Sequence, residues 1–273
     1  MKRITKKSKI IVLSVISMLI IIWGYAGYRF IKHELRQNID ISNLQASNAM
    51  LRAEIDSLTN TIEWGDGYNY LAIGNSITKH PIGSYWWQED GMAASKAEKD
   101  YFHLIVAWLD LSYPNVKAFA YNAAAWEIQT NDRSEGLSVW DSYLSEELDL
   151  VTIQLSENMD DTSTFESDFK EMVEYVIKKC PNAQIIVIDE FWSEEKSELK
   201  KKVIDALNAE GHTVEFADLS RIRGVNKYMA GLGTKVYDAE GNAHVIEHKG
   251  VAKHPGDFGI QQYATLITEL INK

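Results

Sequence analysis

The chain has 273 residues, of which 45 % are apolar and 25 % charged, with 4 prolines and a single cysteine. This composition is that of a folded globular protein and excludes a disordered or collagen-like chain, and one cysteine (Cys180) excludes an internal disulfide. The net charge of −11 is unevenly distributed, because residues 1–36 carry +7 and the remaining 237 residues carry −18. We do not expect so acidic a body to bind nucleic acid, whose phosphates need cationic side chains.

The basic N-terminal end precedes a membrane-anchor pattern. Residues 10–28 are 19 positions without a charged side chain, and five of the first nine residues are basic. At ~1.5 Å per residue such a helix is about 28 Å long, enough to cross the hydrocarbon core. The basic cluster predicts a cytoplasmic tail over residues 1–9 and an extracytoplasmic C-terminal domain at the cell membrane. A cleaved signal peptide is the alternative, although the apolar segment is long for one.

A heptad pattern follows within residues 34–62. Positions 41, 48, 55 and 62 are Ile, Asn, Ile and Ile, and positions 44, 51 and 58 are all Leu. Ile at the a position with Leu at d favours parallel two-stranded coiled coils, and a single Asn at a fixes the register. The pattern predicts a stalk that makes a parallel homodimer through residues 41–62. A lone amphipathic linker helix is the alternative, because about three heptads are near the minimum for a coil.

From residue 66 to residue 273, short apolar runs alternate with helical patterns. The patterns predict strands over residues 68–73, 116–121, 149–155, 184–189 and 213–217, and helices over 97–111, 133–146, 164–180, 194–209 and 259–272. Near-continuous apolar strands separated by helices are typical of a parallel sheet covered on both faces. The predicted fold class is α/β, a three-layer α/β/α sandwich with a central parallel sheet of about five strands. Residues 236–246 predict a small hairpin before the last helix.

Three polar side chains lie at predicted strand ends or before the last helix, where parallel sheets bind ligands. Ser76 follows the first strand in Gly74-Asn75-Ser76, where a sharp turn after glycine is expected to expose it at the start of a helix. Asn158 follows the third strand, and His254 precedes the last helix. A serine hydroxyl needs a base to act as a nucleophile, a histidine can be that base near neutral pH, and an asparagine amide can hold an oxyanion.

Each of these residue types also has an ordinary structural interpretation. A serine after glycine is often a helix N-cap, and an asparagine after a strand is often a turn residue. His244, His248 and His254 could instead bind zinc, but their spacing fits no compact ligand motif. We therefore expect no metal and no cofactor.

The order of Ser76, Asn158 and His254-Pro255 along the predicted sheet resembles that of the SGNH/GDSL hydrolase family, over nearly all of residues 66–273. Residues 74–78, 86–87, 91–95 and 100–101 are similar to a bacterial, carbohydrate-esterase-like subgroup. The resemblance implies a flavodoxin-like sandwich with Ser76 as nucleophile and His254 as general base. It also implies that the Asn158 side chain and the Ser76 backbone N–H hold the oxyanion.

The chain departs from the family pattern at several positions. Asn75 replaces the family's Asp, Ser156 replaces a Gly, and the block that begins at Asn122 lacks the family's oxyanion glycine although Asn122 itself matches. Val251 stands where the family has an Asp three residues before the histidine. The third member is then Glu247, Asp257 or a backbone carbonyl, or the site is a Ser–His dyad.

The resemblance implies acyl transfer through an acyl-Ser76 intermediate. With water as acceptor the protein is a serine esterase that removes acetyl groups from a carbohydrate; with a sugar hydroxyl it is an O-acyltransferase on an envelope glycan. A non-catalytic glycan-binding protein on the same frame is a further alternative. The residues expected to bind substrate are Tyr85, Trp86, Trp87, Asn122, Trp126 and Glu127. Aromatic faces can stack on sugar rings, although core packing also explains tryptophans, and Glu127 would either bind a sugar hydroxyl or orient His254.

Overall fold

The computed structural model describes residues 62–129 and 132–271. The anchor expected over residues 10–28 and the stalk expected over residues 34–62, apart from Ile62, lie outside these ranges and stay predictions. None of the helices in the described ranges combines the length and apolar character needed to cross a bilayer.

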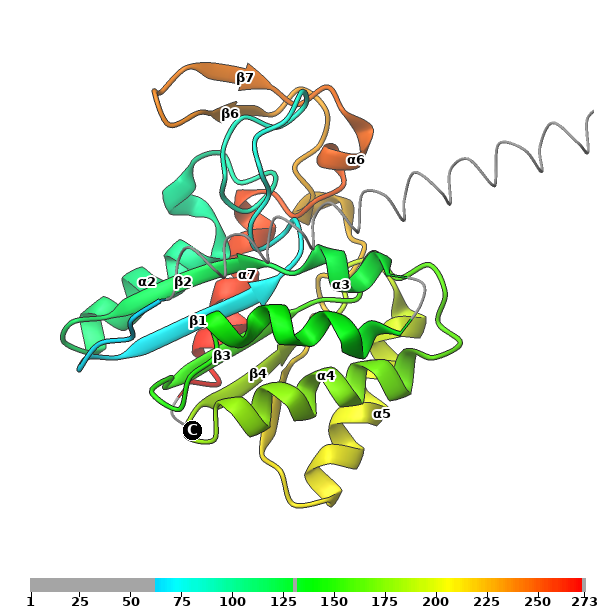
Figure 1. The fold of residues 1–273 in the computed structure, drawn as a ribbon. Coiled ribbons are helices and arrows are strands. Elements are labelled where there is room, and N and C mark those ends of the chain that lie inside the picture. Colours follow the sequence, from blue (N-terminus) through cyan, green and yellow to red (C-terminus); the bar gives the residue numbers. More distant parts are fainter. Residues whose placement is uncertain (1–61, 130–131, 272–273) are drawn as a thin grey trace, which may run out of the picture. The chain divides into compact units, whose positions relative to one another are not determined.

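The core of the fold is a parallel five-stranded sheet in the order β2-β1-β3-β4-β5 (Figure 1). The strands are β1 (Asn69–Gly74), β2 (Lys117–Asn122), β3 (Leu150–Gln154), β4 (Gln184–Ile188) and β5 (Val214–Ala217). All five expected strands are confirmed. β1 and β3 are buried along their whole length, because helices cover both faces of a parallel sheet and leave neither face for polar side chains.

Helices form a layer on each face of the sheet, which confirms the expected α/β/α sandwich (Figure 1). One layer holds α2 (Tyr101–Ser112) and α7 (Asp257–Thr268); the other holds α3 (Ala124–Ile128), α4 (Phe165–Lys179), α5 (Glu194–Ala209) and the 3₁₀ helix η2 (Arg133–Ser142). Successive residues of β1 alternate between the layers: Leu71 and Ile73 pack with α4, whereas Tyr70 and Ala72 pack with α2 and α7. This two-residue alternation is the geometry of a strand buried on both sides.

Two local expectations need correction. The α-helix expected over residues 133–146 is the 3₁₀ helix η2, which contains three serines, an aspartate and a central Gly136, all weak helix formers. The helix expected to start at Ser76 is a tight turn, in which the Asn75 carbonyl accepts the N–H groups of Thr78 and Lys79 at 3.0 Å. Ser76 therefore does not lie at the positive end of a helix dipole.

A smaller structure, here called the hairpin region (residues 79–96 and 229–254), lies beyond the end of the sheet, at the top of Figure 1. It contains β6 (Lys235–Tyr237), β7 (Ala243–Val245) and α6 (Lys249–Ala252), and the short 3₁₀ helices η1 (Ala97–Lys99) and η3 (Asn226–Tyr228) flank it. β6 and β7 are antiparallel, which confirms the expected hairpin. The region has an apolar core of its own around Trp86, Ile246 and Val251, so the segment before His254 is packed from both sides.

Candidate active site

Ser76 and His254 meet although 178 positions separate them in the sequence. The Oγ of Ser76 lies 2.8 Å from Nε2 of His254. Ser76 follows the end of β1, and His254 follows α6, where its N–H bonds to the Val251 carbonyl at 3.0 Å and its carbonyl accepts the Ala230 N–H at 2.9 Å. Both side chains are half-buried, so they are held in place and still reachable from solvent. A hydroxyl hydrogen-bonded to an imidazole is the arrangement of an activated nucleophile and its base.

Steric crowding allows only glycine at position 74, directly before this turn. A Cβ added at Gly74 would lie 1.9 Å from Oγ1 of Thr78 and 2.9 Å from the Gln154 carbonyl oxygen. The Asn75 side chain completes the turn, because its Oδ1 accepts the Ile77 N–H at 3.0 Å. The close approach of Thr78 and β3 to Gly74 therefore determines where Ser76 stands.

The second ring nitrogen of His254 is held by the backbone. Nδ1 donates to the Gly250 carbonyl oxygen at 2.9 Å, which leaves the lone pair of Nε2 for the Ser76 hydroxyl. Nδ1 carries a single N–H, so of the alternatives expected for the third member it is a backbone carbonyl, and neither Glu247 nor Asp257, that orients the ring. Glu247 is exposed, and the Asp257 carboxylate accepts the N–H and Oγ–H of Ser95 at 2.8 and 2.7 Å.

His254 lies among groups that disfavour its charged form. Burial lowers the pKa of His254 to about 4, and the neighbouring His80 and His248 add to this effect. The edge of the ring also packs against Trp192 at a centroid distance of 5.1 Å. The imidazole is therefore neutral at pH 7, the form that can accept a proton.

Asn158 lies on the turn that follows β3, and Glu127 links it to the turn that carries Ser76. Its Nδ2 donates to Oε2 of Glu127 at 2.5 Å, and Oε1 of the same carboxylate accepts Nδ2 of Asn75 at 2.9 Å. A single carboxylate thus links Asn158 to the residue next to Ser76. An amide nitrogen carries two N–H groups, so the bond to Glu127 leaves Asn158 a second N–H.

In the turn after β2, the backbone N–H groups of residues 123 and 124 already have hydrogen-bond partners, so they cannot hold an oxyanion as the family's glycine N–H would. The N–H of Ala123 donates to the Gly74 carbonyl at 2.7 Å, and the N–H of Ala124 donates to Oδ1 of Asn122 at 2.9 Å. Asn122, expected to bind substrate, donates its Nδ2 to the Lys79 carbonyl at 2.6 Å and so fastens the loop after Ser76.

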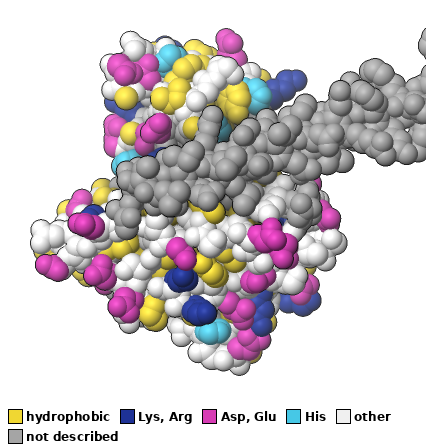
Figure 2. Space-filling model, viewed as in Figure 1, with side chains coloured by type: hydrophobic (Ala, Val, Ile, Leu, Met, Phe, Trp, Pro, Cys, Tyr) yellow, Lys and Arg dark blue, Asp and Glu magenta, His cyan; other side chains and the backbone are white. Residues whose placement is uncertain are grey.

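The aromatic residues expected to bind substrate differ in how far they are exposed. Trp86 and Trp126 are buried, at 0 % and 3 % exposed, and belong to the apolar cores. Trp87 is half-buried with its ring stacked on His244 at 4.5 Å. Tyr85 is 39 % exposed and stacks on His248 at 4.8 Å. Of the four, Tyr85 presents the most open aromatic surface. The hairpin region, at the top of Figure 2, has hydrophobic and histidine side chains at its surface.

Glu127 was expected either to bind a sugar hydroxyl or to orient His254, and its position fits neither role. Its side chain is 1 % exposed, and both carboxylate oxygens are occupied, because they accept hydrogen bonds from Asn75, Asn158 and the Ser156 backbone. The sequence also held no signal for the role of Gly250, because a carbonyl oxygen is present at every position of a chain.

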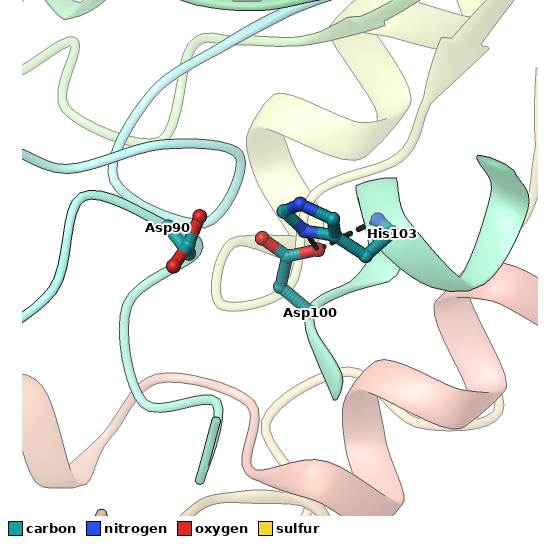
Figure 3. Close-up of side chains that lie close together, drawn as sticks. All are labelled: Asp90, Asp100 and His103. Carbon is teal, nitrogen blue, oxygen red and sulfur yellow. Dashed lines mark hydrogen bonds and ion pairs between the residues drawn. The ribbon is translucent and has the colours of Figure 1, made fainter. Parts of the chain in front are cut away.

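Clusters of acidic and histidine side chains could attract a cation. Asp90, Asp100 and His103 bring one ligand atom each within 4.8 Å of one another (Figure 3). Asp100 is already engaged as the N-cap of α2, because Oδ1 accepts the N–H of His103 at 2.7 Å and lies 2.8 Å from its Nδ1, while Oδ2 accepts the Gly91 N–H at 3.0 Å. Helix capping thus explains why Asp100 and His103 lie together.

The three histidines considered as zinc ligands have separate partners. Nε2 of His244 lies 2.8 Å from the Asp238 carboxylate, and His254 faces Ser76. Nδ1 of His248 accepts the Val251 N–H at 3.4 Å, as the N-cap of α6. They do not converge on one point.

No family model and no curated protein matches this sequence. Among solved structures, a salicylyl-acyltransferase from a tetracycline biosynthetic pathway has 15 % identity and a TM-score of 0.44, over 76 % of this chain and 55 % of that one. A family two carbohydrate esterase from Clostridium thermocellum has 17 % identity and a TM-score of 0.46, over 75 % and 63 %. A member of the lipolytic G-D-S-L family from Veillonella parvula has 12 % identity and a TM-score of 0.43, over 76 % and 99 %. The chain spans less than two thirds of the length of the first two.

Proposed function

We propose that this protein is a serine esterase that transfers the acyl group of an ester to Ser76 and then to water. The observation that carries the proposal is the 2.8 Å contact between Oγ of Ser76 and Nε2 of a neutral His254 whose Nδ1 is held by the Gly250 carbonyl. A nucleophile, a base and a group that orients the base are the parts that acyl transfer needs.

The proposed reaction has two halves. His254 takes the Ser76 proton as Oγ attacks the ester carbonyl, and the second N–H of Asn158 and the Ser76 backbone N–H hold the oxyanion. The imidazolium then protonates the leaving alcohol oxygen, the carbon–oxygen bond breaks, and an acyl-enzyme remains. Water attacks the acyl group with His254 again as base, which releases the acid and restores Ser76. A preorganised oxyanion donor contributes about 10²–10³ to the rate.

For the substrate we propose an O-acetylated carbohydrate. Tyr85 offers an exposed ring whose neighbour His248 lies close enough to His254 to affect its pKa, and an aromatic face beside a nucleophile suits a sugar ring. The net charge of −18 over residues 37–273 disfavours a strongly anionic polymer.

We further propose that the domain is held at the outer face of a membrane by residues 10–28 and dimerises through residues 41–62. The support is the charge and heptad pattern of the sequence. Sedimentation of the chain from residue 34 against the chain from residue 63 tests the stalk: a dimer is expected only for the longer one, and a monomer in both contradicts the coil.

Hydrolysis of an aryl acetate and release of acetate from acetylated xylan test the activity. Ser76→Ala and His254→Ala should each abolish turnover with unchanged circular dichroism. Ser134→Ala is the matched control, because the Ser134 hydroxyl bonds only to Asp132 on the surface. Full activity in Ser76→Ala contradicts the mechanism. Acetylated sugar products formed when sugar acceptors are added would instead identify an O-acyltransferase, and glycan binding without turnover a binding protein.

A further inference from the structure

Glu127 is a buried carboxylate whose partners are all uncharged. Its side chain is 1 % exposed, and burial raises its pKa above the usual value while the hydrogen bonds from Asn75 and Asn158 act against this. The nearest arginine described, Arg133, gives an N–H to the backbone carbonyl of Glu127 at 3.4 Å and pairs its charge with Asp168. Burying a charged carboxylate costs free energy unless hydrogen-bond donors compensate it. The donors that face Glu127 therefore decide how this carboxylate is held.

Three N–H groups from two turns converge on this carboxylate. Oε1 accepts Nδ2 of Asn75 at 2.9 Å and the backbone N–H of Ser156 at 2.5 Å, and Oε2 accepts Nδ2 of Asn158 at 2.5 Å. Asn75 follows β1, Ser156 and Asn158 follow β3, and Glu127 itself lies on α3 after β2. β2, β1 and β3 are neighbours in the sheet, so one side chain ties together the ends of three adjacent strands.

The turn that carries Asn158 is fastened at its base by other groups. Ser156 has a φ of +94°, a conformation that non-glycine residues rarely adopt. Its Oγ donates to Glu190, which pairs with Lys200 at 2.9 Å, and Lys196 donates to the carbonyl oxygens of Ser156 and Glu157 at 3.0 and 2.8 Å. These contacts hold the backbone of the turn, whereas the hydrogen bond to Glu127 is the one that sets the direction of the Asn158 amide.

We propose that Glu127 is a positioning residue that aims the Asn158 amide at the oxyanion and locks it to the Ser76 turn. This rests on the proposed function. A carboxylate is needed because both of its oxygens accept: a glutamine could replace the two bonds to Oε1, but its NH₂ group would face Nδ2 of Asn158, donor against donor.

The same arrangement explains why Asn75 stands where an aspartate was expected from the family resemblance. Its Nδ2 must donate to Glu127, while its Oδ1 accepts the Ile77 N–H. An aspartate here would set two carboxylates in contact inside the protein, and like charges at that distance cannot both ionise. Asn75 and Glu127 thus form a matched pair.

A double-mutant cycle on the full chain tests this role. Glu127→Gln should lower kcat for aryl acetate by about 10²-fold with KM unchanged, as for loss of an oxyanion donor. Asn158→Ala should cost a similar factor, and adding Glu127→Gln to Asn158→Ala should cost less than about threefold, because the first change has removed what Glu127 aims. Losses that multiply in the double variant would overturn the proposal and leave Glu127 with a structural role only.

Glu157→Gln is the matched control. It is the same change one position from Asn158, in a side chain whose Oε1 accepts the Phe191 N–H, a bond that the amide oxygen of glutamine can keep. We expect activity within about twofold of wild type.

A measurement independent of turnover separates this proposal from the proposed function. The side-chain amide signals of Asn158 and Asn75 in a ¹⁵N-labelled protein report their bonds to Glu127, and Glu127→Gln should shift the Asn158 signals most. Unchanged Asn158 signals overturn the proposal. If the wild type hydrolyses no ester, the oxyanion role falls with the proposed function, and the amide shift shows whether Glu127 still orients Asn158.

Discussion

Nδ1 of His254 donates its hydrogen bond to the backbone carbonyl oxygen of Gly250, 2.9 Å away. In Ser-His-Asp sites a carboxylate holds this nitrogen, fixes the tautomer and stabilises the imidazolium that forms during the reaction. A carbonyl dipole fixes the tautomer equally well but offers only a partial charge. The site therefore has an oriented but weak base, in keeping with the low pKa of His254.

If the carbonyl is the third member, removing the acids near His254 will have little effect. We expect Glu247→Gln and Asp257→Asn to keep kcat within about threefold of wild type, because Glu247 is exposed and the amide oxygen introduced by the second change could still accept the Ser95 N–H. Steady-state kinetics on an aryl acetate checks this. A loss of about 10³-fold or more in either variant would identify that acid as the missing partner.

The activity should persist into acid. His254 must be neutral to accept the Ser76 proton, and burial lowers its pKa to about 4, so kcat/KM should stay on its plateau at pH ~6 and fall only as the pH approaches 4. If His254 had the ordinary pKa of a histidine, kcat/KM would already fall from its plateau near pH ~6.5.

The pH profile needs a stability control because the same group affects folding. The unfolded chain binds a proton at His254 near its ordinary pKa, and the folded chain does so only near 4. Unfolding therefore becomes easier as the pH falls through this window, and circular dichroism at each pH separates loss of fold from loss of activity. An acid limb at the ordinary histidine pKa in folded protein contradicts the prediction.

Gly74→Ala should damage both fold and activity. The new Cβ would lie 1.9 Å from Oγ1 of Thr78 and 2.9 Å from the Gln154 carbonyl, which forces β1 away from β3 and moves Ser76. Overpacking of this kind costs about 1–3 kcal/mol, and thermal unfolding together with kcat measures it. Gly83→Ala is the control, since a Cβ at Gly83 meets nothing within 4 Å; equal melting temperatures of the two variants would refute the steric argument.

Tyr85 is expected to act on substrate affinity. Tyr85→Ala should raise KM for an acetylated oligosaccharide several-fold, by about 1 kcal/mol of lost stacking, and leave kcat and aryl acetate turnover unchanged. The control is Tyr175→Ala, because Tyr175 lies on α4 and its hydroxyl donates to Asp141. Unaltered KM on acetylated xylan oligosaccharides in Tyr85→Ala would remove this residue from the substrate site.

The five strands and the sandwich were predictable because each strand is a short apolar run that local sequence reveals, and parallel strands end at one edge. That edge was also enough to bring Ser76, Asn158 and His254 together as a hypothesis. Two predictions were wrong: an α-helix over residues 133–142, which form a 3₁₀ helix, and a helix after Ser76, which lies in a tight turn. Both errors arise because the local sequence pattern does not show how a short segment packs against the rest of the fold.

Only the tertiary structure decided what surrounds the reacting pair. The Gly250 carbonyl that holds His254 is a backbone atom, which side-chain identity does not encode. The burial of Trp86 and the exposure of Tyr85 depend on how the hairpin region packs, and the burial of Trp126 depends on α4 and η2. Glu127 became a buried link among three strand ends because residues 75, 127 and 158 approach one another only after β2, β1 and β3 are placed side by side. A linear pattern records which groups a chain carries, whereas distances among remote groups exist only in the folded molecule.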